Sequence, residues 1–399
     1  MAPVDEIYFE NSWRIRSHPA ITIPVLRAPL PTFGMILPLP KVWFCTTHFF
    51  PVDVDKMRVH IHGQTNYIIE LAAQRFEAVV RSRTSLSSYS TKWSHQQSQL
   101  YELALSYLTH PVGTDRSPGT AGADFNLVTM PTGVWPAEKV DSLWRRFAPY
   151  RQHRQTLEPT ALQTVSVLVK SSGSSWPSLE MDESYTLTVT PKGILLYANE
   201  TWGALHGLTS LIQLLWRVPN SHQVFVNQTF VNDAPRFPHR GLMVDTSRHF
   251  ISKQILLVNL ETMAFHKMNV FHWHIVDDQS YPYQSMKFPN LSDKGAYYPK
   301  QIYSVQDVKE VVEFGRIRGI RVIPEFDVPG HTRSLAYSTP GVLTSCLPSA
   351  ENPTIHFGPL NPLSQATYTF LQALLTEVFS VFKDKFVHLG GDEVEFACW

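Results

Sequence analysis

The chain contains 399 residues, of which 43% are hydrophobic and 12% aromatic, which is enough apolar material for the cores of two domains. Lys and Arg together number 34, and Asp and Glu also number 34, so the formal net charge is zero. This balance, and the lack of a basic run interleaved with aromatic residues, exclude the electrostatic pattern of a nucleic-acid-binding protein.

Residues 1–34 form an N-terminal extension in which no signal peptide is visible. The first ten residues carry Asp5, Glu6 and Glu10 where a signal peptide has a basic segment. Five prolines interrupt the apolar stretch 21–40, which disfavours a hydrophobic helix there. No run of about 18 apolar residues occurs elsewhere, so no transmembrane segment is predicted.

Residues 35–220 are expected to form a small α+β domain. Apolar residues recur at helical spacing from Ile68 to Val79. Alternating residues predict strands at 165–169 and 185–189, and a Pro-Lys-Gly turn before the run 194–198 indicates a hairpin. Thr201 is expected to cap the helix that follows. The part from about 81 to 162 is rich in Ser, Thr, Gln, Gly and Pro and is interpreted as loop or partial disorder, so its fold is left open.

Residues 235–399 repeat a unit in which a short apolar strand runs into a cluster of polar residues. Helical stripes separate these strands, and one of them opens with Ser304 and Asp307 as a capping box. Alternating strands and helices predict a parallel α/β sheet, and polar residues after every strand favour a (β/α)8 TIM barrel over an open doubly wound sheet. About the first four units are present. The four strand regions are 241–244, 270–276, 320–324 and 386–389.

Two neighbouring carboxylates after the last strand are the main catalytic candidates. Asp392 and Glu393 follow Gly390-Gly391, and glycines there allow a sharp turn and close approach of a ligand. Arg248, after the first strand, is a forked donor suited to gripping vicinal hydroxyls or orienting a carboxylate.

Histidines and acids after the middle strands are further candidates. His272 and His274 lie on one strand face, which suits either a hydrogen-bonded core or a metal site of a barrel hydrolase. His331, after the third strand, is within reach of Asp277 on its neighbour and could relay charge to Glu393.

Four segments together closely resemble glycoside hydrolase family 20, and in particular the animal lysosomal and insect β-N-acetylhexosaminidases. The resemblance extends from about residue 237 to 399, and a fainter one covers 164–216, which is similar to the family's small domain before the barrel. The segments are HRGLMVDTSRH (239–249), FHWHIVDD (271–278), EFDVPGHT (325–332) and HLGGDEV (388–394).

The resemblance implies hydrolysis of terminal, non-reducing β-linked GlcNAc or GalNAc with retention, assisted by the substrate's own acetamido oxygen. Asp392 would hold the acetamido N–H, and Glu393 would protonate the leaving oxygen and then activate water. Burial and the charge of Asp392 are expected to keep Glu393 protonated. His331 and Asp277 resemble the dyad that tunes this acid.

Arg248 resembles the residue that binds the sugar's C3 and C4 hydroxyls, and we also assign His274 to substrate binding. No cofactor and no metal are expected. The substrates implied are glycoproteins, glycolipids or chitooligosaccharides, and homo- or heterodimers are expected from the family. The rival readings are a sugar-binding fragment without activity and a metal-dependent barrel hydrolase.

The cysteines and glycosylation sequons bear on the compartment. The three cysteines have no C-x-x-C spacing, so a structural zinc site is not predicted. Cys346 and Cys398 match a pair that forms a disulfide in the lysosomal relatives, whereas Cys45 does not match that pattern. The resemblance and the sequons predict a lysosomal or extracellular protein. The sequons are at Asn199, Asn227 and Asn290.

The chain looks truncated midway through its barrel, which bears on its activity. The family's tryptophan-lined acetamido pocket comes from later strands. Half a barrel also leaves strand edges open and its core half exposed. We therefore expect this chain alone to be poorly active or inactive, and the full-length protein to be an enzyme.

Overall fold

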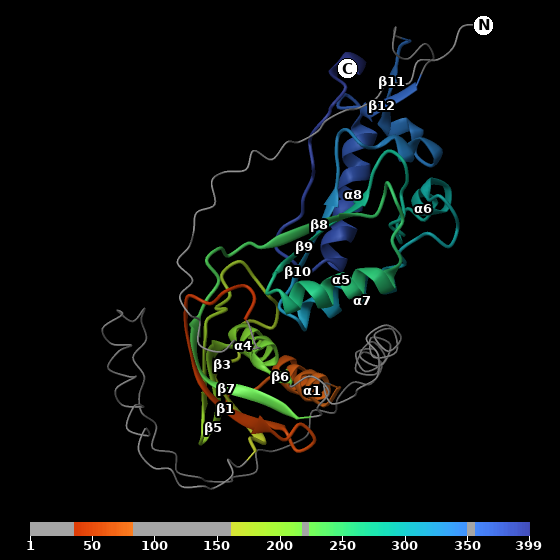
Figure 1. Cartoon of the computed structure of the whole chain (residues 1–399). Coiled ribbons are helices and arrows are strands. Elements are labelled where there is room, and N and C mark those ends of the chain that lie inside the picture. The colour runs from red at the N-terminus through yellow and green to blue at the C-terminus, as the bar shows by residue number, and fades with distance from the viewer. Residues whose placement is uncertain (1–35, 83–160, 218–222, 349–355) are drawn as a thin grey trace, which may run out of the picture.

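The computed structural model describes residues 36–82, 161–217, 223–348 and 356–399. Within them, a small α+β domain precedes a unit of parallel strands covered by helices (Figure 1). This confirms the predicted α/β architecture of a partial barrel behind a small domain. The expectations for residues 1–34 and for most of 81–162 lie outside the described residues.

One mixed sheet forms the body of the small domain, in the order β1-β7-β4-β5-β3-β2, with β6 paired to β7. The predicted hairpin is present, because β4 and β5 pair antiparallel and Thr190 faces Gly193. β2, β3 and β5 run parallel to one another. The strands are β1 (Val42–Val52), β2 (Arg58–Gly63), β3 (Thr164–Ser171), β4 (Tyr185–Thr190), β5 (Gly193–Glu200), β6 (Trp216–Arg217) and β7 (Val224–Asp233).

The small domain extends past the boundary at residue 220 that the sequence indicated. β7 runs to Asp233 and pairs with both β1 and β4, so it is a central strand of this sheet. β1 was not predicted either. Its pairing with β7 shifts register between Cys45 and Phe49, and this irregularity breaks the alternation by which a strand is found in a sequence.

Two helices, α1 (Tyr67–Ser82) and α4 (Thr201–Leu214), pack with the sheet in one core. α1 buries its predicted apolar stripe, including Ile68 and Phe76. The predicted capping role of Thr201 is wrong, because Glu200 occupies the N-cap position. The Thr201 hydroxyl instead donates to the carbonyl of Ser172 at 3.1 Å, which ties the start of α4 to the end of β3.

The second unit is built on three parallel strands, β8 (Gly241–Asp245), β9 (Val270–Val276) and β10 (Arg321–Phe326), in the order β10-β9-β8. The predicted fourth strand is reduced to a single bridge between His388 and Glu325. Its segment lies at the sheet edge, where only β10 offers backbone partners, and Leu389 is 42% exposed. A strand paired on one side only is held by few hydrogen bonds.

Helices cover one face of these strands and bury Phe271 and Trp273 in a core of their own. The capping box at Ser304 and Asp307 is present as predicted. On the opposite face, Met243 of β8 is 54% exposed, whereas Ile323 of β10 is buried. The helices are α5 (Lys253–Phe265), α6 (Asn290–Gly295), α7 (Val305–Arg316) and α8 (Gln365–Val381).

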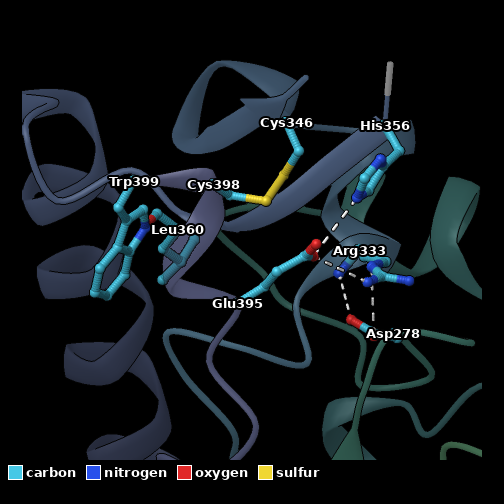
Figure 2. Close-up of a disulfide and its surroundings, with 8 residues drawn as sticks. All are labelled: Asp278, Arg333, Cys346, His356, Leu360, Glu395, Cys398 and Trp399. Atoms are coloured by element: carbon cyan, nitrogen blue, oxygen red, sulfur yellow. Dashed lines mark hydrogen bonds and ion pairs between the residues drawn. A yellow bond between two sulfur atoms is a disulfide. The ribbon is translucent and has the colours of Figure 1, made fainter. Parts of the chain in front are cut away.

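A small C-terminal subassembly joins two distant parts of the chain. β11 (Leu343–Cys346) pairs antiparallel with β12 (His356–Leu360), and the Cys346–Cys398 disulfide links β11 to the 3-10 helix Phe396–Cys398 (Figure 2). A Cβ on Gly358 would lie 2.3 Å from the sulfur of Cys346, so the bond requires glycine there. Short 3-10 helices also span Arg333–Tyr337 and Pro340–Val342.

Among the described residues, no helix combines the length and the apolar character that crossing a membrane requires.

A buried ion pair anchors the segment that leads to the acid pair. Arg321 of β10 contacts Asp384 through two hydrogen bonds of 2.7 and 2.8 Å, and both side chains are under 5% exposed. Removing one member of a buried pair leaves the other charge uncompensated. We expect Asp384→Asn to lower the free energy of unfolding by about 3–5 kcal/mol, measured by urea denaturation.

The matched control for this variant is Lys56→Ala. The Lys56 side chain is 71% exposed and pairs with Asp53 at the surface. Such a pair contributes at most about 1 kcal/mol. Equal losses in the two variants would mean that the Arg321–Asp384 pair has no special role.

Candidate active site

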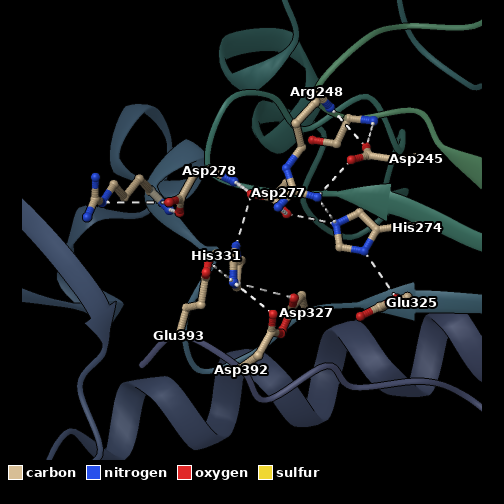
Figure 3. A network of polar contacts seen from close by, with 12 residues as sticks. Asp245, Arg248, His274, Asp277, Asp278, Glu325, Asp327, His331, Asp392 and Glu393 are labelled. Atoms are coloured by element: carbon tan, nitrogen blue, oxygen red, sulfur yellow. Dashed lines mark hydrogen bonds and ion pairs between the residues drawn. The ribbon is translucent and has the colours of Figure 1, made fainter. Parts of the chain in front are cut away.

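Polar side chains from all the strand ends meet at one edge of the parallel sheet, as Figure 3 shows. Because the strands are parallel, their carboxyl ends lie together. Arg248 comes from the segment after β8, and His274 and Asp277 come from the end of β9. His331 follows β10, and the acid pair follows the bridge at His388. Every catalytic candidate predicted from the sequence therefore lies in this cluster.

The glycines before the acid pair serve the turn that the sequence indicated. Gly390 and Gly391 have φ of 64° and 108°, in the left-handed region. A Cβ on Gly390 would lie 1.8 Å from an oxygen of Asp327, so no other residue fits. The N–H of Gly391 donates to the same Asp327 carboxylate at 3.0 Å. Asp327 thus fixes the turn that presents both acids.

Both acids face one imidazole. His331 Nε2 lies 3.7 Å from an Asp392 oxygen and 3.5 Å from a Glu393 oxygen. The two side chains therefore address the same space, as their proposed roles require. The expectation that Glu393 is buried is wrong, because its side chain is 79% exposed and that of Asp392 is 68% exposed. Among the described residues, the acids contact a side chain only on the side that faces the end of β10, where His331 lies.

Two site residues hold an unusual backbone conformation. His331 has φ of 55° and Glu393 has φ of 50°, although neither is glycine. Such conformations cost about 1–3 kcal/mol each and concentrate at functional sites. Here they aim the imidazole and the carboxylate at each other. The sequence pattern carries no signal for this.

The predicted His331–Asp277 dyad is present. His331 Nδ1 lies 3.3 Å from Asp277 Oδ1, and both side chains are buried. His331 Nε2 is buried without a hydrogen-bond partner among the described residues. Burial lowers the pKa of His331, but the charges of Asp277 and Asp327 outweigh it, and the net effect is a raised pKa. The imidazole is thus biased toward its protonated form beside the acid pair.

Asp277 is the shared centre of the polar network. Its Oδ2 lies 2.7 Å from His274 Nε2 and 2.9 Å from Arg248 Nη2. Burial would raise the pKa of Asp277, yet the hydrogen bond from His274 and the charge of Arg248 bring it below its ordinary value. Arg248 also bonds Asp245 at 2.7 Å, while about a third of its side chain stays exposed. Arg248 is thus rigidly held and accessible.

His274 lies behind this network. Its Nε2 contacts Asp277 and its Nδ1 lies 3.1 Å from Glu325, with only 5% of the side chain exposed. Burial lowers its pKa, but the hydrogen bonds with the two carboxylates raise the pKa to about 9. Since both ring nitrogens are occupied and covered, the assignment of His274 to substrate binding is not supported. The structure gives it the role of orienting Asp277.

The donor set for the rival metal site is also visible. His272 Nε2 lies 2.5 Å from Glu325, and His388 Nδ1 lies 3.1 Å from it. Burial would raise the pKa of Glu325, but hydrogen bonds from His272 and His274 lower it strongly. The Nδ1 of His388 also accepts the N–H of Gly390 at 3.1 Å. His272 and Glu325 therefore satisfy each other as a hydrogen-bonded pair, whereas the half-exposed His388 uses Nδ1 to accept the Gly390 N–H.

Three residues of the site were given no role from the sequence. Asp245 and Asp327 were visible at strand ends, but a lone aspartate after a strand is normally solvated surface. Glu325 was equally visible, and only the contacts across β9 and β10 reveal its partners. For Glu325 and Asp327 the informative signal is spatial, because their partners are distant in the chain, whereas Asp245 pairs with Arg248 three residues further on.

The three sequon asparagines differ in their exposure and in their hydrogen bonds. Asn290 is exposed, and Asn199 donates to Asp182 at 2.9 Å. Asn227 is buried and its amide is bonded on both sides, to Trp216 at 2.6 Å and to a backbone carbonyl at 2.9 Å, which argues against a glycan there.

The expected Cys346–Cys398 disulfide is present, and Cys45 is a free thiol whose pKa is raised by burial.

Two family models match the chain. Residues 237–399 match the model described as glycosyl hydrolase family 20, catalytic domain. Residues 36–214 match the model described as beta-acetyl hexosaminidase like. The matched regions correspond to the partial barrel and to most of the small domain.

Curated relatives and solved structures that resemble this chain agree with the two family models. Beta-hexosaminidase subunit alpha of Bos taurus is 48% identical over 64% of this chain and 47% of that protein. Subunit beta of Homo sapiens is 47% identical over 63% of this chain and 46% of that protein, so the chain spans about half the length of these relatives. A chitobiase structure from Flavobacterium johnsoniae aligns with TM-score 0.65 and 26% identity, covering 92% of this chain and 46% of that one.

A structure of an exo β-N-acetylglucosaminidase from Vibrio harveyi shares the fold, with TM-score 0.59 and 21% identity over 92% of this chain and 48% of that one. The two family models cover both units, and the parallel strands bring the four sequence segments into one cluster. The chain belongs to glycosyl hydrolase family 20.

Proposed function

We propose that the protein is a retaining exo-β-N-acetylhexosaminidase that removes terminal β-linked GlcNAc or GalNAc from glycoconjugates or chitooligosaccharides. The observation that carries the proposal is the position of His331, whose buried Nε2 lies within 3.7 Å of both acids. An imidazole held by Asp277 and aimed at an exposed carboxylate pair suits proton exchange with a substrate that binds over that pair.

In the proposed reaction, the acetamido oxygen of the sugar attacks the anomeric carbon while the glycosidic bond breaks. Glu393 gives its proton to the leaving oxygen, and His331 stabilises the carboxylate that remains. Asp392 accepts the acetamido N–H and stabilises the positive charge of the oxazolinium-like intermediate. Water then adds to the anomeric carbon as the bond from that carbon to the acetamido oxygen breaks, and Glu393 takes the proton of the water, which regenerates the protonated acid.

Arg248 is proposed to bind sugar hydroxyls. Its guanidinium is fixed by Asp245 and Asp277, so its exposed N–H groups are already oriented. A donor held in place before binding loses little side-chain entropy when the ligand arrives. His274 supports this arrangement from behind through its bond to Asp277.

We also infer the compartment and the partners of the protein. The relatives are named as subunits alpha and beta, which supports a homo- or heterodimer. The disulfide and the exposed Asn290 support an oxidising, secretory or lysosomal environment. Glycan, glycolipid and chitooligosaccharide substrates all present the terminal sugar that the reaction needs.

A second candidate function is sugar binding without turnover. The observation that favours it is the exposure of the acid pair, because electrostatic stabilisation is strongest where water is excluded. The two candidates share the same ligand and differ in rate.

Glu393→Gln tests the acid assignment. The variant keeps the shape of the side chain but has no proton to donate. We expect hydrolysis of a chromogenic β-GlcNAc substrate to fall about 10²-fold or more, while calorimetry shows unchanged binding of a thiazoline mimic of the intermediate. Retained hydrolysis would overturn the assignment. Failure of the unmodified chain to bind the mimic would overturn the site itself.

Chelation separates the proposal from the metal-hydrolase reading. The proposed reaction uses only side chains and the substrate's acetamide. Turnover and thiazoline binding should therefore be the same before and after dialysis against EDTA. Loss of either one on chelation, with recovery on adding Zn²⁺, would favour the cluster of His272, Glu325 and His388 as the working centre.

The raised pKa of His274 predicts a pH dependence of stability. Its pKa rises from 6.5 in the unfolded chain to about 9 in the fold, so the folded state binds the proton more tightly. This contribution is fully present below about pH 6.5 and disappears as the pH rises through about 9. The stability of the wild type relative to His274→Gln should therefore fall by on the order of 3 kcal/mol between pH 6 and pH 10. A difference that does not change with pH, measured by urea denaturation, would show that His274 is neutral in the fold.

A further inference from the structure

A second chain of polar contacts runs beside the acid pair. The backbone N–H of Arg333 donates to Asp278 Oδ1 at 2.9 Å, and its Nε lies 3.7 Å from Asp278 Oδ2. On the other side, its Nη2 lies 3.5 Å from Glu395 Oε2. Arg333 therefore bridges the segment after β9 and the C-terminal segment, as Figure 2 shows. We call Asp278, Arg333 and Glu395 the outer chain.

The outer chain follows the catalytic contacts in sequence. Each of its residues comes one or two positions after a member of the inner set, which is Asp277, His331 and Glu393. The two sets therefore lie on the same three segments. A change in the spacing of the outer contacts changes the spacing of the inner ones, because only one or two backbone units separate them.

The acid pair has few other supports. Its side chains make no hydrogen bond to the described residues, and the approach of His331 to Glu393 is 3.5 Å. Before the pair, the segment is held by the bond from Gly391 N–H to Asp327. After the pair, it is held by Glu395 and by the disulfide at Cys398. Of these anchors, Glu395 is the closest along the chain on the C-terminal side, and both Arg333 and His356 lie 3.5 Å from its Oε2.

We propose that Arg333 is a positioning residue for the proposed reaction, which sets the distance between His331 and the acid pair by holding Glu395 against Asp278. Arg333 touches no reacting atom in this arrangement and acts through the backbone of the two segments. Its role in catalysis rests on the proposed function. Its effect on the surroundings of His331 can be measured without turnover.

The sign of a charge effect separates positioning from simple electrostatics. The charged groups facing His331 are Asp277, Asp327, Asp392 and Glu393. Removing the positive charge of Arg333 from this neighbourhood would by itself raise the pKa of His331. Releasing the C-terminal segment would instead take the last two carboxylates away, and the pKa of His331 would fall. The two explanations predict opposite shifts.

The test is an NMR pH titration of the ¹⁵N-labelled histidines in the whole chain, with the His331 signal assigned from its loss in His331→Gln. We expect Arg333→Gln to lower the pKa of His331 by about one unit, and Arg333→Lys to restore most of it. Exposed pairs add little to stability, and Arg333 is 52% exposed, so the variant should fold.

Amide exchange measured by mass spectrometry gives the second readout. We expect faster exchange over residues 386–399 in Arg333→Gln and in Glu395→Gln, and unchanged exchange in the matched control Arg236→Gln, which removes an exposed arginine outside the outer chain. An unchanged or raised pKa of His331 in Arg333→Gln, or unchanged exchange of the segment, would overturn the proposal.

Turnover distinguishes this proposal from the proposed function. Where hydrolysis is measurable, Arg333→Gln should lower kcat by about ten-fold or more and leave KM nearly unchanged, because the acid is misplaced but the sugar contacts remain. If the pKa and exchange results hold while Glu393→Gln keeps full hydrolysis, the positioning role stands and the assignment of Glu393 as the acid falls.

Discussion

The arrangement of the site depends on one buried carboxylate. Asp277 is fully covered, and its two oxygens receive His274, His331, Arg248 and the backbone N–H of Asp278. A buried anion is tolerated only when it is paired and hydrogen-bonded. Because its partners come from three segments, satisfying this one charge also fixes the ends of β8, β9 and β10 relative to one another.

The parallel sheet brings the partners of Asp277 together. Parallel strands deliver their polar ends to one edge, and the helices on one face supply the packing that holds β9 and β10 rigid. The fourth segment differs, because it bonds to β10 alone, through backbone hydrogen bonds of His388 and Leu389 and the buried Arg321–Asp384 pair. The acid pair therefore follows a segment with a neighbour on one side, whereas His331 follows β10, which has a neighbour on both sides.

The sequence predicted the regular elements wherever the apolar pattern was periodic. The helices at 67–82, 305–316 and 365–381 were found because one face of each is buried. The strand at 224–233 and the irregular β1 were missed, and the register shift between Cys45 and Phe49 breaks the alternation of β1. The acid pair was recognised by its setting after a glycine pair, and its dyad by family resemblance. The burial expected of Glu393 was wrong, because its exposure depends on what packs around it in space. The substrate role of His274 stays a prediction, which its two bonded ring nitrogens do not favour.

Gly358 shows how a residue without chemistry of its own can govern the chemistry of others. Its missing side chain leaves the room in which two sulfurs meet, and any larger residue would occupy the path of the bond. Replacement of this glycine would therefore imitate the loss of a cysteine while both thiols are still encoded. In a set of inherited variants, such a change would be grouped with cysteine mutations by its consequence, although its own position carries no reactive atom.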